Sequence, residues 1–194
     1  MEVNVRHVVL YAVEQASGRA NGKTYVQKLC FFVSKLIGQP LGFRAHYYGP
    51  YSDQVSAELA FLTGAGLVTE TRRGSGMAGA GGWEIARFDY SLTDDGKKAV
   101  GQLAERQPDE ATSVRHAIQR IFAAGEQNYV ELSFAAKTNW ILENSGGPMT
   151  FDGIARAAEK FRWNVSGTDV VKAATFLEKL GLVQLKPSPG GHAK

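Results

Sequence analysis

Apolar residues recur at every third or fourth position through the N-terminal third of the chain, a spacing typical of one buried helix face. This pattern predicts helices over residues 3–16, 24–36 and 53–63. The segment 41–48 between the second and third helices is short and rich in aromatic residues, which favours extended backbone. Ser52 stands directly before the third helix, where a serine hydroxyl is suited to capping the first turn.

Beyond the third helix the pattern changes to that of a β-hairpin. Residues 67–72 and 83–90 are predicted strands, and five of the nine residues 74–82 between them are glycines, so we expect a mobile tip. The second strand continues through a Y-x-L-T-x-x-G stretch, Tyr90 to Gly96, into a helix that extends to about residue 106. Thr93 is the predicted cap of that helix. Three helices followed by a hairpin are typical of a winged helix.

From residue 108 onward the periodicity is helical throughout. It predicts four helices, over residues 112–124, 129–142, 151–161 and 168–180. The last two, with the turn between them, resemble a helix-turn-helix. Residues 177–183 also repeat the order of residues 62–68, in which a helix ends at a glycine and a Leu-Val pair follows.

The chain is therefore predicted to be an α+β protein, mainly helical. We expect a winged-helix domain with a β-hairpin wing over residues 1–107, a helical extension with the helix-turn-helix-like unit over 108–185, and a flexible tail over 186–194. Trp83, Trp140 and the Phe-rich second helix are expected to be largely buried.

The most distinctive residues lie in two segments, Tyr25-Val26-Gln27-Lys28-Leu29-Cys30-Phe31-Phe32 and Phe43-Arg44-Ala45-His46-Tyr47-Tyr48-Gly49-Pro50-Tyr51-Ser52. With the predicted wing, these segments resemble the YwgA-like proteins, and more distantly the Panacea (SocA-like) antitoxin domain, which has a comparable Q-K-L and Y-G-P pair. The YwgA-like resemblance continues to residue 183 and implies a winged-helix fold without an established chemistry. The Panacea resemblance implies an antitoxin that binds a protein.

Composition and charge exclude some classes of protein but do not identify a function. The chain has 194 residues, 22 Lys and Arg against 19 Asp and Glu, and a net charge of +3, which excludes a strongly basic protein that coats nucleic acid. The two halves of the chain are similarly balanced. The single cysteine, Cys30, excludes an internal disulfide. No secretory signal or membrane-spanning run is present, so we expect a cytoplasmic protein.

The leading functional hypothesis is a non-enzymatic regulator that binds DNA through its wing and basic helix ends. Helix 53–63 is a poor reader of the major groove because it contains Asp53 and Glu58 and no Lys or Arg. The candidate DNA-contacting residues therefore lie elsewhere: Lys28, Arg44, His46, Arg72, Arg73, Arg156, Lys160 and Arg162.

The alternative is a protein-interaction module, either an antitoxin or an accessory subunit of a larger complex, for example in defence. Its candidate partner-binding residues are Tyr48 and Tyr51, in an aromatic cluster that is also compatible with a simple core junction. A homodimer is compatible with either hypothesis. The four histidines have no metal-ligand spacing, and Cys30 lies on an apolar helix face. We therefore expect no catalytic residues, no metal and no cofactor.

Overall fold

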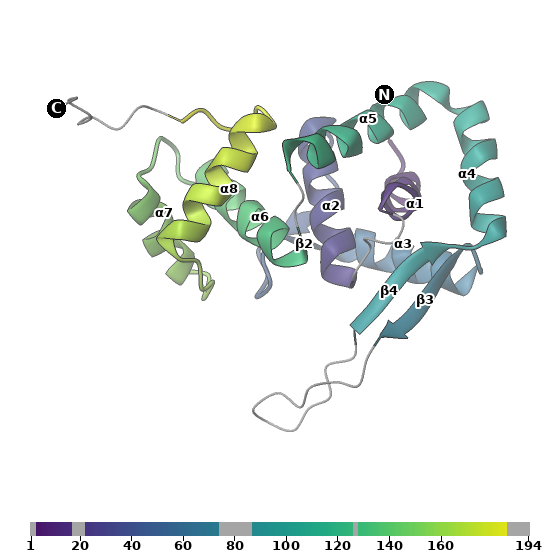
Figure 1. Cartoon of the computed structure of the whole chain (residues 1–194), viewed down its shortest axis with the longest axis horizontal. Coiled ribbons are helices and arrows are strands. Elements are labelled where there is room, and N and C mark those ends of the chain that lie inside the picture. Colours follow the sequence, from purple (N-terminus) through teal and green to yellow (C-terminus); the bar gives the residue numbers. More distant parts are fainter. Residues whose placement is uncertain (1–2, 17–21, 74–86, 126–127, 186–194) are drawn as a thin grey trace.

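In a computed structural model of the chain, which describes residues 3–16, 22–73, 87–125 and 128–185, helices dominate and the strands form small antiparallel hairpins (Figure 1). The elements are α1 (Val5–Gln15), α2 (Lys23–Leu36), β1 (Phe43–Arg44), β2 (Tyr51–Ser52), α3 (Asp53–Gly64), β3 (Val68–Arg73), β4 (Arg87–Leu92), α4 (Asp94–Arg106), α5 (Pro108–Ala124), α6 (Tyr129–Glu143), α7 (Phe151–Glu159) and α8 (Gly167–Lys179). The predicted α+β, mainly helical class is confirmed.

Helix α2 lies at the centre of the molecule. It packs against α1, α3, α5 and α6, and in Figure 1 it stands between α1 and α4 on one side and α6 to α8 on the other. Every residue from Tyr25 to Ser34 is buried, so this helix has no solvent face over nearly three turns. The predicted burial of its phenylalanines is confirmed, since Phe31 and Phe32 are fully inaccessible.

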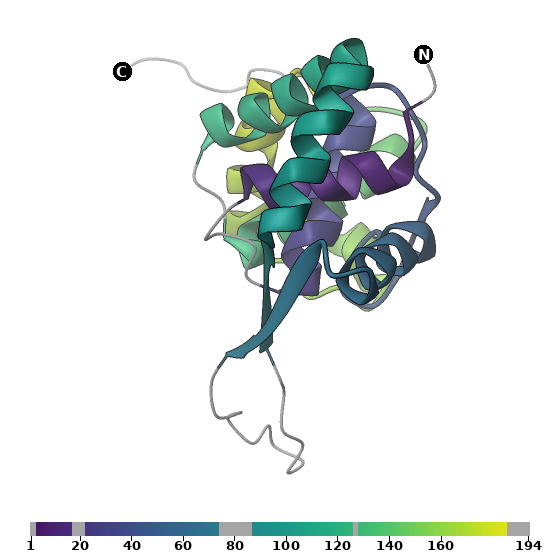
Figure 2. The same ribbon diagram turned by 90° about the vertical axis from the view of Figure 1, so that its right-hand side faces the viewer.

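The longer hairpin joins β3 to β4 in antiparallel register, from Val68 opposite Leu92 to Arg73 opposite Arg87. It extends away from the helices in both views (Figures 1 and 2). The predicted glycine-rich tip and Trp83 lie outside the described residues. A second hairpin pairs Phe43 with Ser52 and Arg44 with Tyr51; the sequence indicated extended backbone there but not this pairing.

The predicted helix starts are confirmed at two caps. The Ser52 hydroxyl accepts a hydrogen bond from the Val55 N–H, and the Thr93 hydroxyl accepts one from the Gly96 N–H. Helix α5 begins four residues earlier than predicted because Pro108 occupies its first turn, where a missing N–H costs no helical hydrogen bond.

Two hydrophobic cores hold the helices together. The main core contains residues of α1, α2, α3, α5, α6 and α8, and so continues across the predicted boundary at residue 107. A smaller core between α6, α7 and α8 contains Ile141, Ile154, Trp163 and Val170. Trp140 is partly buried and packs against both cores, in agreement with the expectation that most of its surface is covered.

The similarity between residues 62–68 and 177–183 is also a similarity of backbone geometry. Gly66 and Gly181 both have a positive φ, +71° and +73°. The N–H groups of Leu67 and Leu182 donate to the carbonyls of Leu62 and Leu177, each at 3.0 Å, which completes the same C-terminal cap. Residues 62–68 lead directly into strand β3. In the part of the chain that is described, residues 183–185 form no strand.

Candidate functional site

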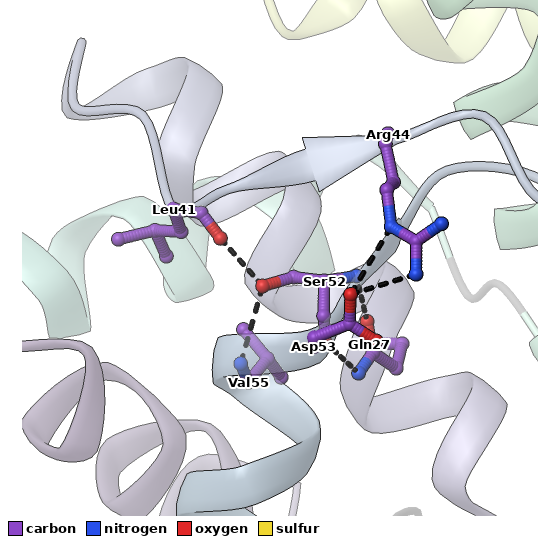
Figure 3. A network of polar contacts seen from close by, with 6 residues as sticks. All are labelled: Gln27, Leu41, Arg44, Ser52, Asp53 and Val55. Carbon is purple, nitrogen blue, oxygen red and sulfur yellow. Dashed lines mark hydrogen bonds and ion pairs between the residues drawn. The ribbon is translucent and has the colours of Figure 1, made fainter.

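The two distinctive sequence segments meet in the structure through the side chain of Gln27 (Figure 3). The Gln27 amide donates to the Ser52 carbonyl at 2.9 Å and accepts from the Ser52 N–H at 2.9 Å. Both atoms of Ser52 are buried, so the glutamine supplies the hydrogen bonds that a neighbouring strand or water would otherwise provide. The Gln27 side chain thereby attaches the β1–β2 hairpin to the central helix.

Lys28 makes the next contact along the same helix. Its Nζ donates to the Pro50 carbonyl at 2.6 Å, and the side chain is only 1% exposed. The structure therefore contradicts the assignment of Lys28 to a DNA-binding surface, because its side chain is enclosed between α2 and the Gly49-Pro50 turn and is not presented to the backbone of a duplex. Desolvation, followed by the nearby charge of Lys137, lowers the pKa of Lys28 to about 7.

The turn that carries Pro50 is built around Gly49. This residue has a φ of +96°, a conformation that side chains rarely adopt. A Cβ added to Gly49 would lie 3.1 Å from the Cγ of Lys137 and 3.5 Å from the Cε of Lys28. The backbone at residue 49 therefore passes between two lysine stems, and the Gly-Pro pair is needed for this close approach.

A pocket of about 430 Å³ opens between the N-terminal half of α2 and the β1–β2 hairpin. Its lining combines side chains of Lys, Arg and His with two tyrosine rings and one carboxylate: Lys23, Thr24, Gln27, Lys28, Arg44, His46, Tyr48, Tyr51 and Asp53. Besides Lys28, the pocket brings together Arg44 and His46, which were predicted to contact DNA, with Tyr48 and Tyr51, which were predicted to bind a protein partner. A larger hollow, of about 730 Å³, lies apart from these residues, between α6 and α8.

Residues 46–48, which we call the tyrosine loop, lie within the connection between the two short strands. The His46 carbonyl accepts hydrogen bonds from the Gly49 N–H at 2.9 Å and from the Trp163 indole N–H at 2.7 Å. Tyr47 and Tyr48 are nevertheless 64% and 63% exposed, and their rings meet edge to face at 4.9 Å. A fixed backbone thus presents two large aromatic side chains to solvent.

The remaining predicted cations are distributed over separate surfaces. Arg44 is exposed and pairs with Asp53 at 2.7 Å, and Arg72 is exposed on β3. Arg73 ends that strand, and its side chain lies outside the description. Exposed Arg156, Lys160 and Arg162 group at the end of α7 and the turn after it, next to the Trp163 that bonds to the tyrosine loop.

We next consider the residues that could act as a nucleophile or as metal ligands. Cys30 is completely buried, and desolvation raises the pKa of its thiol to about 12, so the reactive thiolate is disfavoured. Within the described residues no three side chains of the His, Cys, Asp and Glu types come together as a metal site. Among the helices described, none combines the length and apolar composition that a bilayer crossing requires.

Three residues of this region are not among the site residues predicted from the sequence: Gln27, Lys137 and Trp163. Gln27 and Lys28 are two of only three polar residues in the ten-residue stretch 25–34, which indicates a helix buried on all sides and polar groups with internal partners. Trp163 is 117 residues from His46, and no local pattern marks that contact.

No protein-family model matches the chain, and no curated protein sequence matches it. The resemblance to YwgA-like and Panacea proteins therefore stays a prediction, and function has to be argued from the site.

The depressed pKa of Lys28 predicts a specific dependence of stability on pH. Below pH 7 the lysine is charged in both folded and unfolded chains, and the cost of burying the charge is fully present. Between pH 7 and 10 the folded chain gives up the proton first, so the free energy of unfolding rises with pH by about 1 kcal/mol per unit.

We expect Lys28→Met to lose this slope, because methionine has no charge to bury. Urea denaturation of both proteins at pH 7, 8 and 9 measures it. Equal slopes in the two proteins would mean that Lys28 keeps an ordinary pKa.

Proposed function

We propose that this chain is a non-enzymatic winged-helix module of the cytoplasm that binds a protein partner through its tyrosine loop. In this proposal α1, α2 and α3 are the three helices and the β3–β4 hairpin is the wing. The observation that carries the proposal is the pair of exposed rings, Tyr47 and Tyr48, on a backbone held by Trp163 and by Lys28. Rigid, exposed tyrosines are typical anchors of protein interfaces, because they bury much area with little loss of entropy.

The surface of α3 supports a protein partner over DNA. This helix takes the position of a recognition helix, yet its exposed residues include Ala57, Ala60 and Phe61 and no cation. Its carboxylates are already paired, Glu58 with Arg6 at 2.7 Å and Asp53 with Arg44. Small and aromatic side chains suit contact with another protein, whereas phosphate binding needs positive charge. The Panacea resemblance agrees with this choice.

We expect the double variant Tyr47→Ser/Tyr48→Ser to fold normally and to lose its partner, since both rings are solvent-exposed and contribute to binding rather than to the core. The test is affinity capture from the organism that encodes the chain, with one stoichiometric protein retained by the wild type. Phe151→Ser, at an exposed ring of α7, is the matched control and should retain it. Recovery of the wild type alone, or equal capture by the double variant, would contradict the proposal.

DNA binding through the α7–α8 unit is a second candidate, favoured by exposed Arg156, Lys160 and Arg162. Within the described residues no carboxylate pairs with these three side chains, so their charge is available to phosphates. DNA anisotropy at 50 mM and 200 mM salt tests it: neutralising the three by Gln should reduce both affinity and salt dependence. Lys97→Gln/Lys98→Gln on α4 is the control, and absence of low-salt binding by the wild type would exclude this candidate.

A further inference from the structure

The most unusual electrostatic feature of the molecule is the unbalanced positive charge around the Gly49-Pro50 turn. Lys28 and Lys137 flank this turn from α2 and α6, and within the described residues neither has a carboxylate partner. Desolvation lowers the pKa of both. A cation that is buried without a counter-ion destabilises the fold, and a bound anion would remove that cost.

The pocket over this turn is built to receive such an anion. Lys23, Lys28 and Arg44 line it against the single carboxylate of Asp53, which Arg44 already engages. The first turn of α2 opens on the same space through Lys23 and Thr24, and it contains no acidic residue. Its N-cap, Gly22, has no side chain, and among the described residues the N–H groups of Lys23 and Thr24 have no partner, whereas those of Tyr25 and Val26 donate to the Gly22 carbonyl. Free N–H groups at a helix start, together with two lysines, favour a phosphate group in particular.

The space available exceeds that of one phosphate. A volume of about 430 Å³ lies in the range of sites for small organic ligands. The rings of His46 and Tyr51 lie 5.1 Å apart at the wall of the pocket, and Tyr48 stands beside His46 at 6.1 Å. These rings offer flat apolar surface on which a planar group attached to the phosphate can stack.

We propose that this pocket binds a phosphate group, with Lys23, Lys28 and the start of α2 as its ligands and the rings of His46, Tyr48 and Tyr51 holding the remainder of a nucleotide. The inference does not depend on the protein partner proposed above. Lys28 then has two functions, since it orders the turn through Pro50 and supplies charge at the floor of the pocket.

Isothermal titration of the full chain at low salt tests the proposal with inorganic phosphate, ribose 5-phosphate, AMP and adenosine. We expect AMP to bind, ribose 5-phosphate to bind more weakly, and adenosine not to bind. Equal affinity for AMP and inorganic phosphate would identify free phosphate as the ligand and overturn the role proposed for the three rings. No binding of any phosphate compound, or adenosine binding as tightly as AMP, would overturn it.

Variants locate the binding within the molecule. Lys28→Met should weaken AMP at least tenfold, and Lys23→Met, at an exposed position that the fold does not need, should weaken it severalfold. Lys35→Met, on the same helix but paired with Glu143 outside the pocket, should leave the affinity unchanged. Circular dichroism confirms folding of each variant. Equal effects of Lys23→Met and Lys35→Met would place the anion elsewhere and contradict the proposal. The Tyr47→Ser variant alone should keep AMP while losing the protein partner, so the two proposals fail separately.

Discussion

Replacing Gly96 by alanine is expected to destabilise the protein by about 3 kcal/mol, although the same change inside a helix ordinarily stabilises it. Gly96 lies in the first turn of α4, and a Cβ there would stand 2.0 Å from the Leu67 carbonyl oxygen. That oxygen is held in place because it accepts the Thr93 N–H at 3.1 Å. The helix can therefore accommodate a methyl group only by moving away from the start of β3.

Gly101 of the same helix is the matched control. It is exposed, and nothing lies within 4 Å of the position its Cβ would take. Gly101→Ala should therefore raise the free energy of unfolding by about 1 kcal/mol. Urea denaturation of the two variants beside the wild type measures both changes. If Gly96→Ala were as stable as Gly101→Ala, the packing of α4 against Leu67 would be looser than the structure shows.

The local elements of this fold could be predicted because their determinants are local. Helix periodicity and the caps at Ser52 and Thr93 depend on residues within four positions of one another. The Y-x-L-T-x-x-G stretch likewise contains Thr93, which caps α4, and Gly96, which allows α4 to pack against the Leu67 carbonyl. The β1–β2 hairpin could not be predicted, since two-residue strands have almost no pattern and this pair is held by Gln27 from another element.

The error over Lys28 has a different origin. Lysine is exposed in most proteins, so the sequence alone predicts a lysine in a helix to lie on the surface. Its true position depends on the packing of α5, α6 and the β1–β2 hairpin around α2, which periodicity within α2 does not reveal. The same long-range packing brings Trp163 to His46, so the candidate site is a property of the assembled helices rather than of one motif.

Replacing Gln27 by leucine is expected to lower the free energy of unfolding by about 3 kcal/mol, because two buried backbone groups of Ser52 would lose their partner at once. Leucine fills much of the same space, so the loss reports on hydrogen bonding more than on a cavity. Gln102→Leu, at an exposed position of α4, is the matched control and should change stability by less than about 0.5 kcal/mol.

Denaturation of both leucine variants compares these expectations directly, and equal stabilities would show that water can replace the Gln27 amide at Ser52. The predicted difference matters for function because Gln27 also lines the pocket. Ser52 begins α3 and ends the hairpin that carries the tyrosine loop, so releasing it frees both surfaces proposed to bind. The Q-K pair of α2 and the G-P-Y-S turn are therefore best understood as one structural unit, in which Gln27 sets the position of the turn and Lys28 sets its charge.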